Sequence, residues 1–202
     1  ILIHTLQLFQ EHEEIDKIYL AMNADYIRYA KQLAIDYRID KLTAIVEGGE
    51  TAQDSIYHAL SKAAQENPQD SVVLIHDGVR PVVGYGVISD NIESVKKYGS
   101  AITSTLCYET VLVSKDGATV DEMPLRKQSY TAQAPQSFYL KDIIEAHEAI
   151  RSTPEGYENM VDACTIYRAL GRQPHMGIGN RGNIKVTTPE DVYMFRALLQ
   201  YK

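Results

Sequence analysis

Over its first hundred residues the chain alternates short apolar segments with longer segments of helical periodicity. Apolar residues recur at helical spacing in 1–9, 25–37, 51–67 and 86–99, and the short apolar stretches between them cover 15–23, 42–49 and 70–77. Parallel neighbouring strands need crossover helices, so this alternation predicts an α/β fold with a doubly wound, mostly parallel sheet. Ligands of such sheets bind beyond the carboxyl ends of the strands.

The pattern changes after Gly99. Residues 100–120 are rich in β-forming residues with a hairpin signal at Asp116 and Gly117, and 129–139 is expected to be irregular and extended. The remaining expected elements are helices at 140–152 and 159–171, strands at 175–179 and 183–188, and a helix opening at Thr188. Residues 105–131 do not fit the layered core, so we interpret them as a β-rich insert, an arm that could contact a partner subunit.

Composition restricts the class and the partners. A chain of 202 residues, 45% hydrophobic and 23% charged without a biased tract, suits one globular domain over 1–202. The net charge of −7 argues against a nucleic-acid partner, and the absence of a long apolar run argues against a membrane span. Cys107 and Cys164 have no CxxC spacing, which predicts no disulfide framework and no zinc site and suits the cytoplasm.

A charged loop follows the strand-like segment 72–75. An ionised carboxylate drawn into a sheet is costly unless a partner compensates it, so Asp77 is expected where the strand meets a cleft. Asp77 could hold a divalent cation that neutralises nucleotide phosphates, while Gly78 admits the ligand to the backbone. Alternatively, Asp77 pairs with Arg80 and orders the loop. His76 is interpreted as structural.

Two glycines join the strand at 42–49 to the next helix. Gly48 and Gly49 could form a ligand wall of backbone groups, with Ser55 reaching in and the helix N-terminus available to partial negative charge. They could equally form a tight turn. Thr51 and Asp54 have the spacing of a capping box, which predicts the helix start.

Two further charged residues have open interpretations. Asp162 lies among apolar neighbours, where an uncompensated carboxylate is costly, so it either faces a cleft or caps its helix. Lys185 precedes a strongly capped helix, and its ammonium group could reach a phosphate or simply be exposed.

Five motifs in this order, VEGG…DSI, VLIHDGVRP, AQAPQSF, VDACT and NIKVTTPED, resemble those of the cytidylyltransferases that make CDP-activated polyol phosphates. This family contains 2-C-methyl-D-erythritol 4-phosphate cytidylyltransferase and ribitol-5-phosphate cytidylyltransferase. The resemblance covers essentially the whole chain, and HDGVRP and NIKVTTPED are its specific parts. It implies a Rossmann-like nucleotidyltransferase fold and transfer of CMP from CTP, with Mg²⁺, to a small polyol phosphate with release of pyrophosphate. Ribitol 5-phosphate is the favoured acceptor.

The resemblance also implies roles for individual residues. Lys185 would meet phosphate at the reacting centre, and Asp77 would serve the nucleotide and its metal. Arg126 would reach across a homodimer to the other subunit's polyol phosphate, helped by Thr110, and Asp162 would line the acceptor pocket. The implied nucleotide-binding residues are Gly48, Gly49, Ser55, Asp77, Gly78 and Arg80.

The chain departs from the family pattern in three places. Ala52 stands where arginine is usual, and Ala134 where threonine is common. Family chains also begin with a strand and a Gly-rich loop that precede the position matching Ile1, so we expect the native protein to carry this segment. These departures motivate a rival hypothesis, a non-catalytic nucleotide-binding or assembly subunit. A dinucleotide-dependent oxidoreductase is disfavoured because no GxGxxG pattern is present.

Overall fold

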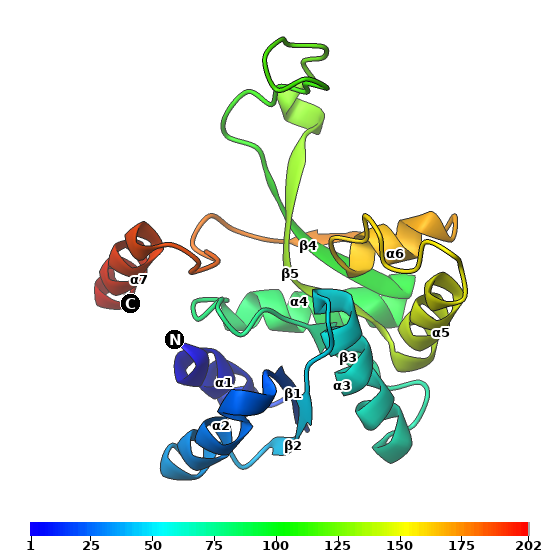
Figure 1. Ribbon diagram of the computed structural model, residues 1–202. Coiled ribbons are helices and arrows are strands. Elements are labelled where there is room, and N and C mark those ends of the chain that lie inside the picture. The colour runs from blue at the N-terminus through cyan, green and yellow to red at the C-terminus, as the bar shows by residue number, and fades with distance from the viewer. Residues whose placement is uncertain (202) are drawn as a thin grey trace.

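Helices cover both faces of the sheet, as the alternation of segments predicts (Figure 1). The computed structural model describes residues 1–201. In chain order the elements are α1 (Leu2–Glu11), β1 (Ile18–Met22), α2 (Ala24–Asp36), β2 (Leu42–Glu47), α3 (Ala52–Glu66), β3 (Val72–Ile75), α4 (Tyr85–Tyr98), β4 (Ser100–Leu106), the 3₁₀ helix η1 (Arg126–Gln128), β5 (Tyr130–Tyr139), α5 (Leu140–Arg151), α6 (Ala163–Ala169), β6 (Met176–Ile178) and α7 (Pro189–Tyr201).

The strands form two hydrogen-bonded groups. β1 and β2 pair in parallel, and the second group has the order β3-β5-β4-β6. β4 and β6 are parallel, whereas β5 runs antiparallel to both β3 and β4. The α/β class and the double winding are confirmed, and β5 adds antiparallel pairs to them. Within residues 1–201 no hydrogen bond joins β1 to β3, so the sheet is open between these two strands.

The alternation of side chains along β3 explains the two helical layers. Val73 and Ile75 pack into a core with α3, α5 and α6, centred on the fully buried Phe138. Val72 and Leu74 face the opposite way and pack with α1 and α4. Each of these side chains is partly buried, and contacts on both faces together hold β3 in the sheet.

The expectation of irregular structure for 129–139 is wrong, because Tyr130–Tyr139 form the central strand β5. Its polar residues hid the strand pattern in the sequence. They are accommodated by side-chain partners: the Ser137 hydroxyl donates to the Asn91 side chain at 2.8 Å, and the Gln136 amide donates to Asp162 at 2.8 Å. Hydrogen bonds to residues outside the strand therefore allow its polar side chains to be buried in the sheet.

Several element boundaries also differ from expectation. Helix α2 begins at Ala24 instead of at residue 25. Its cap is Asn23, whose side chain accepts a hydrogen bond from the Asp25 backbone amide. The predicted helix at 159–171 begins only at Ala163. The predicted strand at 183–188 is irregular and is held to the loop after β3 by one backbone bond, from Val186 N to the Val79 carbonyl at 2.8 Å.

The arm, residues 105–131, projects away from the body between β4 and β5 (Figure 1). Its β content is lower than expected, since beyond the strand ends it holds one antiparallel bridge, Val113 to Glu122. The predicted turn is present, with Gly117 in the left-handed region at φ 70°. Among the helices of the described chain, none combines the length and apolar character needed to cross a bilayer.

Candidate active site

A cavity of about 290 Å³ opens at the carboxyl ends of β1 and β2, where a ligand site was expected. Residues from both strand ends and from the first turns of α2 and α3 line it. They are Ala21, Met22, Asn23, Ala24, Asp25, Glu47, Gly48, Gly49 and Ser55. The structure thus brings Gly48, Gly49 and Ser55 to one wall.

Contacts with α3 hold the Gly48–Gly49 wall in place. The Ser55 hydroxyl accepts a hydrogen bond from the Gly49 amide at 3.0 Å and donates to the Thr51 carbonyl at 3.0 Å. A Cβ atom on residue 49 would lie 2.2 Å from the Cβ of Asp54, a distance that real contacts do not reach. Glycine at 49 is therefore a steric requirement of the close approach between loop and helix.

The first turn of α3 is already occupied by its own cap. Thr51 Oγ1 accepts from the Asp54 amide at 3.0 Å, and Asp54 Oδ2 accepts from the Thr51 hydroxyl at 2.7 Å. Because a carboxylate already sits at this positive helix end, the expectation that it is available to further negative charge is not supported. The wall suits a flat, uncharged group such as a nucleobase better than a phosphate.

Asp77, after β3, has two cationic partners. Arg80 Nε donates to its Oδ2 at 2.9 Å and Lys185 Nζ donates to its Oδ1 at 3.0 Å. Burial disfavours the ionised carboxylate, but the hydrogen bonds from Arg80 and Lys185 outweigh it and keep the pKa of Asp77 below its ordinary value. Of the two hypotheses for this loop, the ion pair with Arg80 is present, and the carboxylate keeps lone pairs that a metal could share.

Lys185 reaches Asp77 because the segment before α7 is bonded to the loop after β3. Arg80 Nη1 donates to the backbone carbonyl of Asn183 at 2.7 Å. The buried side-chain amide of Asn183 donates to the backbone carbonyl of Ala134 at 2.7 Å. Asp77 and Lys185, 108 positions apart in the chain, thus lie together as expected. Neither belongs to the lining of the cavity at the ends of β1 and β2.

His76 has the environment of a structural residue. Its Nε2 lies 3.1 Å from the Arg80 carbonyl, and its ring lies 5.0 Å from that of Phe9. Burial lowers the pKa of His76 to about 4, so the ring is neutral near pH 7. A neutral ring bonded to backbone orders the loop that carries Asp77.

Asp162 acts as a helix cap, the second of its two predicted interpretations. Its Oδ1 accepts a hydrogen bond from the Thr165 backbone amide at 2.8 Å, and its Oδ2 accepts one from the Gln136 side-chain amide at 2.8 Å. Both oxygens have partners within the protein, so this arrangement holds α6 against β5. A role of Asp162 at the acceptor would add to this contact.

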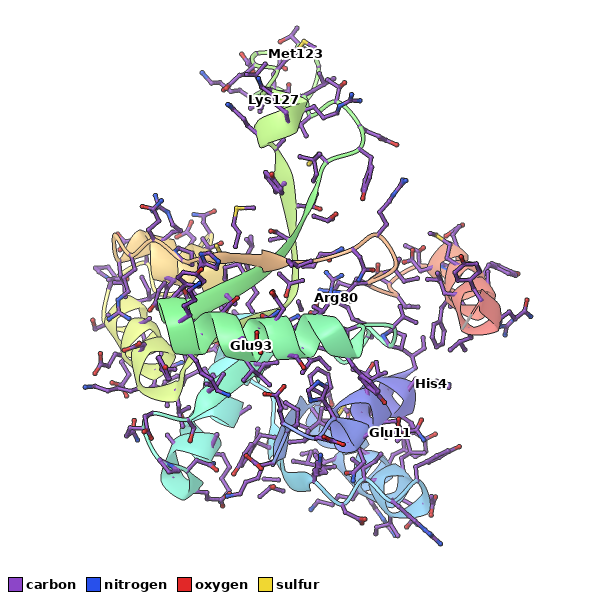
Figure 2. The ribbon with its side chains drawn as sticks, turned by 180° about the vertical axis from the view of Figure 1, so that it is seen from behind. His4, Glu11, Arg80, Glu93, Met123 and Lys127 are labelled. Carbon is purple, nitrogen blue, oxygen red and sulfur yellow. The ribbon has the colours of Figure 1, made fainter. Side chains whose placement is uncertain are left out.

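Thr110 and Arg126 lie on the arm, exposed and away from the Asp77 group of the same chain. Figure 2 places Met123 and Lys127 at the far end of the arm and Arg80 in the body. Arg126 Nη1 donates to the Tyr108 carbonyl at 3.4 Å. One chain alone therefore does not join these arm residues to Asp77 and Lys185.

The sequence interpretation missed Arg151 and Arg181. Arg151 pairs with Asp54 at 2.8 Å, and the Arg181 guanidinium lies 3.8 Å from the centre of the Tyr108 ring. No motif links these partners, because each pair joins elements that are distant along the chain.

The donor set fits a metal that arrives with a nucleotide better than a resident metal. Over residues 1–201 no group of three or more histidine, cysteine, aspartate or glutamate side chains is arranged to hold a metal. Nucleotide-borne Mg²⁺ keeps several waters and uses only one or two carboxylates in addition to phosphates. Asp77 can supply one.

A doubly wound α/β sheet with a cavity at its strand ends, and with a carboxylate paired with a lysine after another strand, has the architecture expected of a nucleotidyltransferase. The chain belongs to the 2-C-methyl-D-erythritol 4-phosphate cytidylyltransferase (IspD) family, whose sequence profile matches residues 1–201. It is therefore a CTP-dependent nucleotidyltransferase, and the catalytic hypothesis is favoured over a non-catalytic subunit.

Individual relatives agree. The chain is 41% identical to a ribitol-5-phosphate cytidylyltransferase of Streptococcus agalactiae serotype V, covering 98% of this chain and 82% of the relative. It is 33% identical to a 2-C-methyl-D-erythritol 4-phosphate cytidylyltransferase of Alkaliphilus oremlandii, covering 99% and 83%. The crystal structure of 4-diphosphocytidyl-2C-methyl-D-erythritol synthase from Anaerococcus prevotii superposes with a TM-score of 0.86 at 29% identity, covering 98% of this chain and 85% of that one.

Proposed function

We propose that this chain transfers CMP from CTP to ribitol 5-phosphate and releases pyrophosphate. The observation that carries the choice of acceptor is the order of similarity. Relatives named ribitol-5-phosphate cytidylyltransferase are 41% and 38% identical, whereas those named 2-C-methyl-D-erythritol 4-phosphate cytidylyltransferase are 31–33% identical. The second acceptor, 2-C-methyl-D-erythritol 4-phosphate, remains the alternative of the same class.

In the proposed reaction an acceptor phosphate oxygen attacks the α-phosphorus of CTP. A new P–O bond forms, the bond to the bridging oxygen of the β-phosphate breaks, and pyrophosphate leaves with that electron pair. Positioning and charge stabilisation supply most of the catalysis of such transfers. Gly48, Gly49 and Ser55 hold the cytosine, and Lys185, already charged beside Asp77, stabilises the developing negative charge.

Mg²⁺ fits this site at Asp77, and when bound it would neutralise phosphate charge. Gly78, next to Asp77, would present its backbone amide to the nucleotide, since its carbonyl already accepts a hydrogen bond from the Thr5 hydroxyl at 2.9 Å. Arg80 keeps the Asp77 carboxylate oriented and ties the loop to the segment of Lys185. Replacing Asp77 by Asn is expected to abolish turnover.

We further propose that a strand with a Gly-rich loop precedes Ile1 and lies between β1 and β3. The support is the open edge between these strands, which share no hydrogen bond within the described chain. Edges of this kind are normally paired or covered. The coding sequence upstream of residue 1 tests this directly.

The proposed assembly is a homodimer joined through the arm. Exposed apolar side chains along the arm, among them Leu112, Met123 and Leu125, support it. In this arrangement Thr110 and Arg126 complete the acceptor site of the other subunit, and Asp162 borders it. The free thiols of Cys107 and Cys164 fit the reducing cytoplasm.

The test is pyrophosphate release from CTP and Mg²⁺ with ribitol 5-phosphate, 2-C-methyl-D-erythritol 4-phosphate and glycerol 3-phosphate in parallel, using the full-length protein. We expect the highest kcat/KM with ribitol 5-phosphate. Faster turnover of the methylerythritol compound would reassign the acceptor, and no release with any of the three would favour the non-catalytic hypothesis.

A further inference from the structure

An arginine at the end of α5 reaches the helix turn beneath the proposed nucleobase wall. Arg151 Nη1 donates to Asp54 Oδ1 at 2.8 Å, across 97 positions of sequence. The two side chains are 39% and 24% exposed, and partly exposed ion pairs contribute about 0–1 kcal/mol to stability. Stability alone therefore gives little reason for this pair.

Aromatic rings hold the Arg151 guanidinium in the position from which it contacts Asp54. Its Cζ lies 4.4 Å from the centre of the Tyr57 ring and 5.8 Å from that of Tyr157. The Tyr157 hydroxyl lies 2.5 Å from Nδ1 of His147, which is fully buried. A side chain oriented in advance loses less conformational entropy in binding its partner, so the Arg151–Asp54 contact is preorganised.

Asp54 transmits this contact to the loop. Its Oδ2 accepts hydrogen bonds from the Thr51 hydroxyl at 2.7 Å and the Thr51 amide at 3.3 Å, at the end of the loop. Its Cβ also packs against Gly49, so closely that a Cβ on residue 49 would lie 2.2 Å from it. A shift of Asp54 must therefore move Thr51 and Gly49.

The pair also has an electrostatic consequence. Asp54 places a carboxylate close to the pocket where a nucleotide with a negative triphosphate is proposed to bind. Hydrogen bonds from Thr51, together with the hydrogen bond and the positive charge of Arg151, outweigh the opposing effect of burial. They keep the pKa of Asp54 below its ordinary value, so this carboxylate is ionised near pH 7. Arg151 is the cation that neutralises it.

We propose that Arg151 is a positioning residue that, through Asp54, sets the geometry of the Gly48–Gly49 wall and thereby the selectivity for cytosine over uracil. This inference rests on the proposed nucleobase site. Arg151 touches neither substrate nor the reacting atoms, and it acts only through the first turn of α3.

The matched experiment compares Arg151→Met with Arg172→Met. Arg172 is also an arginine over a tyrosine ring, 5.0 Å from Tyr167, with similar exposure, but it contacts α5 and not α3. We expect Arg151→Met to raise the KM for CTP about tenfold, equivalent to about 1.4 kcal/mol, with kcat changed by less than about twofold. The preference for CTP over UTP should fall about fivefold or more. Arg172→Met should leave both quantities unchanged.

Two further variants keep the test decisive if Arg151→Met folds poorly. Asp54→Asn should reproduce the loss of CTP affinity and selectivity, and the double variant should be no worse than the poorer single one, because both act through one contact. Arg151→Lys should restore part of the selectivity. Unchanged CTP affinity and selectivity in Asp54→Asn, or strictly additive effects, would overturn the inference.

The readout separates this inference from the proposed acceptor. CTP and UTP affinities are also measured by calorimetry without any polyol phosphate. If no acceptor supports turnover but CTP affinity still depends on Arg151, the acceptor proposal fails and the positioning role stands. If the variants turn over ribitol 5-phosphate with wild-type selectivity, the positioning role fails alone.

Discussion

Single charged and ionisable residues in this protein depend on partners that lie far away in the chain. The Asp77 carboxylate forms ion pairs with Arg80 and Lys185, and the His147 ring is fully buried between aromatic rings. Although burial opposes them, hydrogen bonds from Arg80 and Lys185 lower the pKa of Asp77, and burial lowers that of His147. Two predictions belong to this scale.

Replacing Lys185 by Met removes the ammonium group proposed to stabilise charge at the transferred phosphate. We expect kcat to fall by about 10²–10³-fold, the usual cost of losing one preorganised electrostatic donor. The melting temperature should change little, because the Lys185 side chain is 47% exposed. Lys141→Met, which removes a surface ion pair 3.9 Å long, is the control. Near-normal kcat in Lys185→Met would exclude this residue from the mechanism.

His147 should make the fold acid-sensitive. Burial lowers its pKa to about 4 in the folded protein, against an ordinary value near 6.5, so between these pH values the unfolded chain binds a proton that the folded chain refuses. The free energy of unfolding should therefore be highest above pH 6.5 and should fall by up to about 3 kcal/mol as the pH drops to 4.

Urea denaturation at pH 7 and pH 4.5 measures this effect. In His147→Gln the loss of stability between the two pH values should shrink by about half, because His76, with its pKa also lowered to about 4, keeps its share. His58→Gln changes an exposed histidine and serves as control. An unaltered pH slope in His147→Gln would show that this ring is not the titrating group.

At the scale of elements, the junctions between strands and helices carry the chemistry. The β2–α3 turn forms the proposed base wall, and the β3–α4 loop carries Asp77. Each is closed by hydrogen bonds to a cap or to a distant segment. At the β2–α3 turn the close contact between Gly49 and Asp54 leaves no room for added volume.

Gly49→Ala tests this intolerance. The added methyl group would overlap Asp54, so α3 must shift, and overpacking of this kind costs about 1–3 kcal/mol. We expect a lower melting temperature and a KM for CTP raised about tenfold or more. Gly86→Ala is the matched control, because its Cβ in α4 would meet no atom within 4 Å. Equal behaviour of the two variants would contradict the steric role of Gly49.

At the scale of the whole molecule, the arm separates two sets of proposed site residues. Thr110 and Arg126 lie on it, whereas Asp77 and Lys185 lie in the body. Figure 2 shows Lys127, the neighbour of Arg126, on the arm and Arg80, the partner of Asp77, in the body. In the proposed homodimer the two sets meet because a second copy of the chain supplies the arm. The site is then shared between subunits.

Mixing two defective variants tests this sharing. Arg126→Ala alone should raise the KM of the acceptor much more than that of CTP. When Arg126→Ala is mixed with Lys185→Met and subunits exchange, each mixed dimer contains one site with both native residues, so about a quarter of wild-type activity should return. If Arg126 acts within its own chain, no activity returns.

Local patterns predicted most of the elements. Helical spacing located α1, α2, α3 and α4, the helix signal at Thr188 located α7, and the capping box of Thr51 and Asp54 is present as expected. β5 was missed, because its buried Gln136 and Ser137 look like loop residues until their partners are known. The segment 183–188 was assigned to a strand because its apolar alternation is real, although its bonds go to a loop and not to a sheet edge.

The sequence by itself determined the α/β class, the family and the positions of the glycines and charged residues, because periodicity, turns and motifs depend on neighbours along the chain. Only the tertiary structure decided that Lys185 meets Asp77, that Gln136 binds Asp162, and that Arg151 reaches Asp54. Each of these contacts joins elements that are distant along the chain, and their distances are set by how the layers pack.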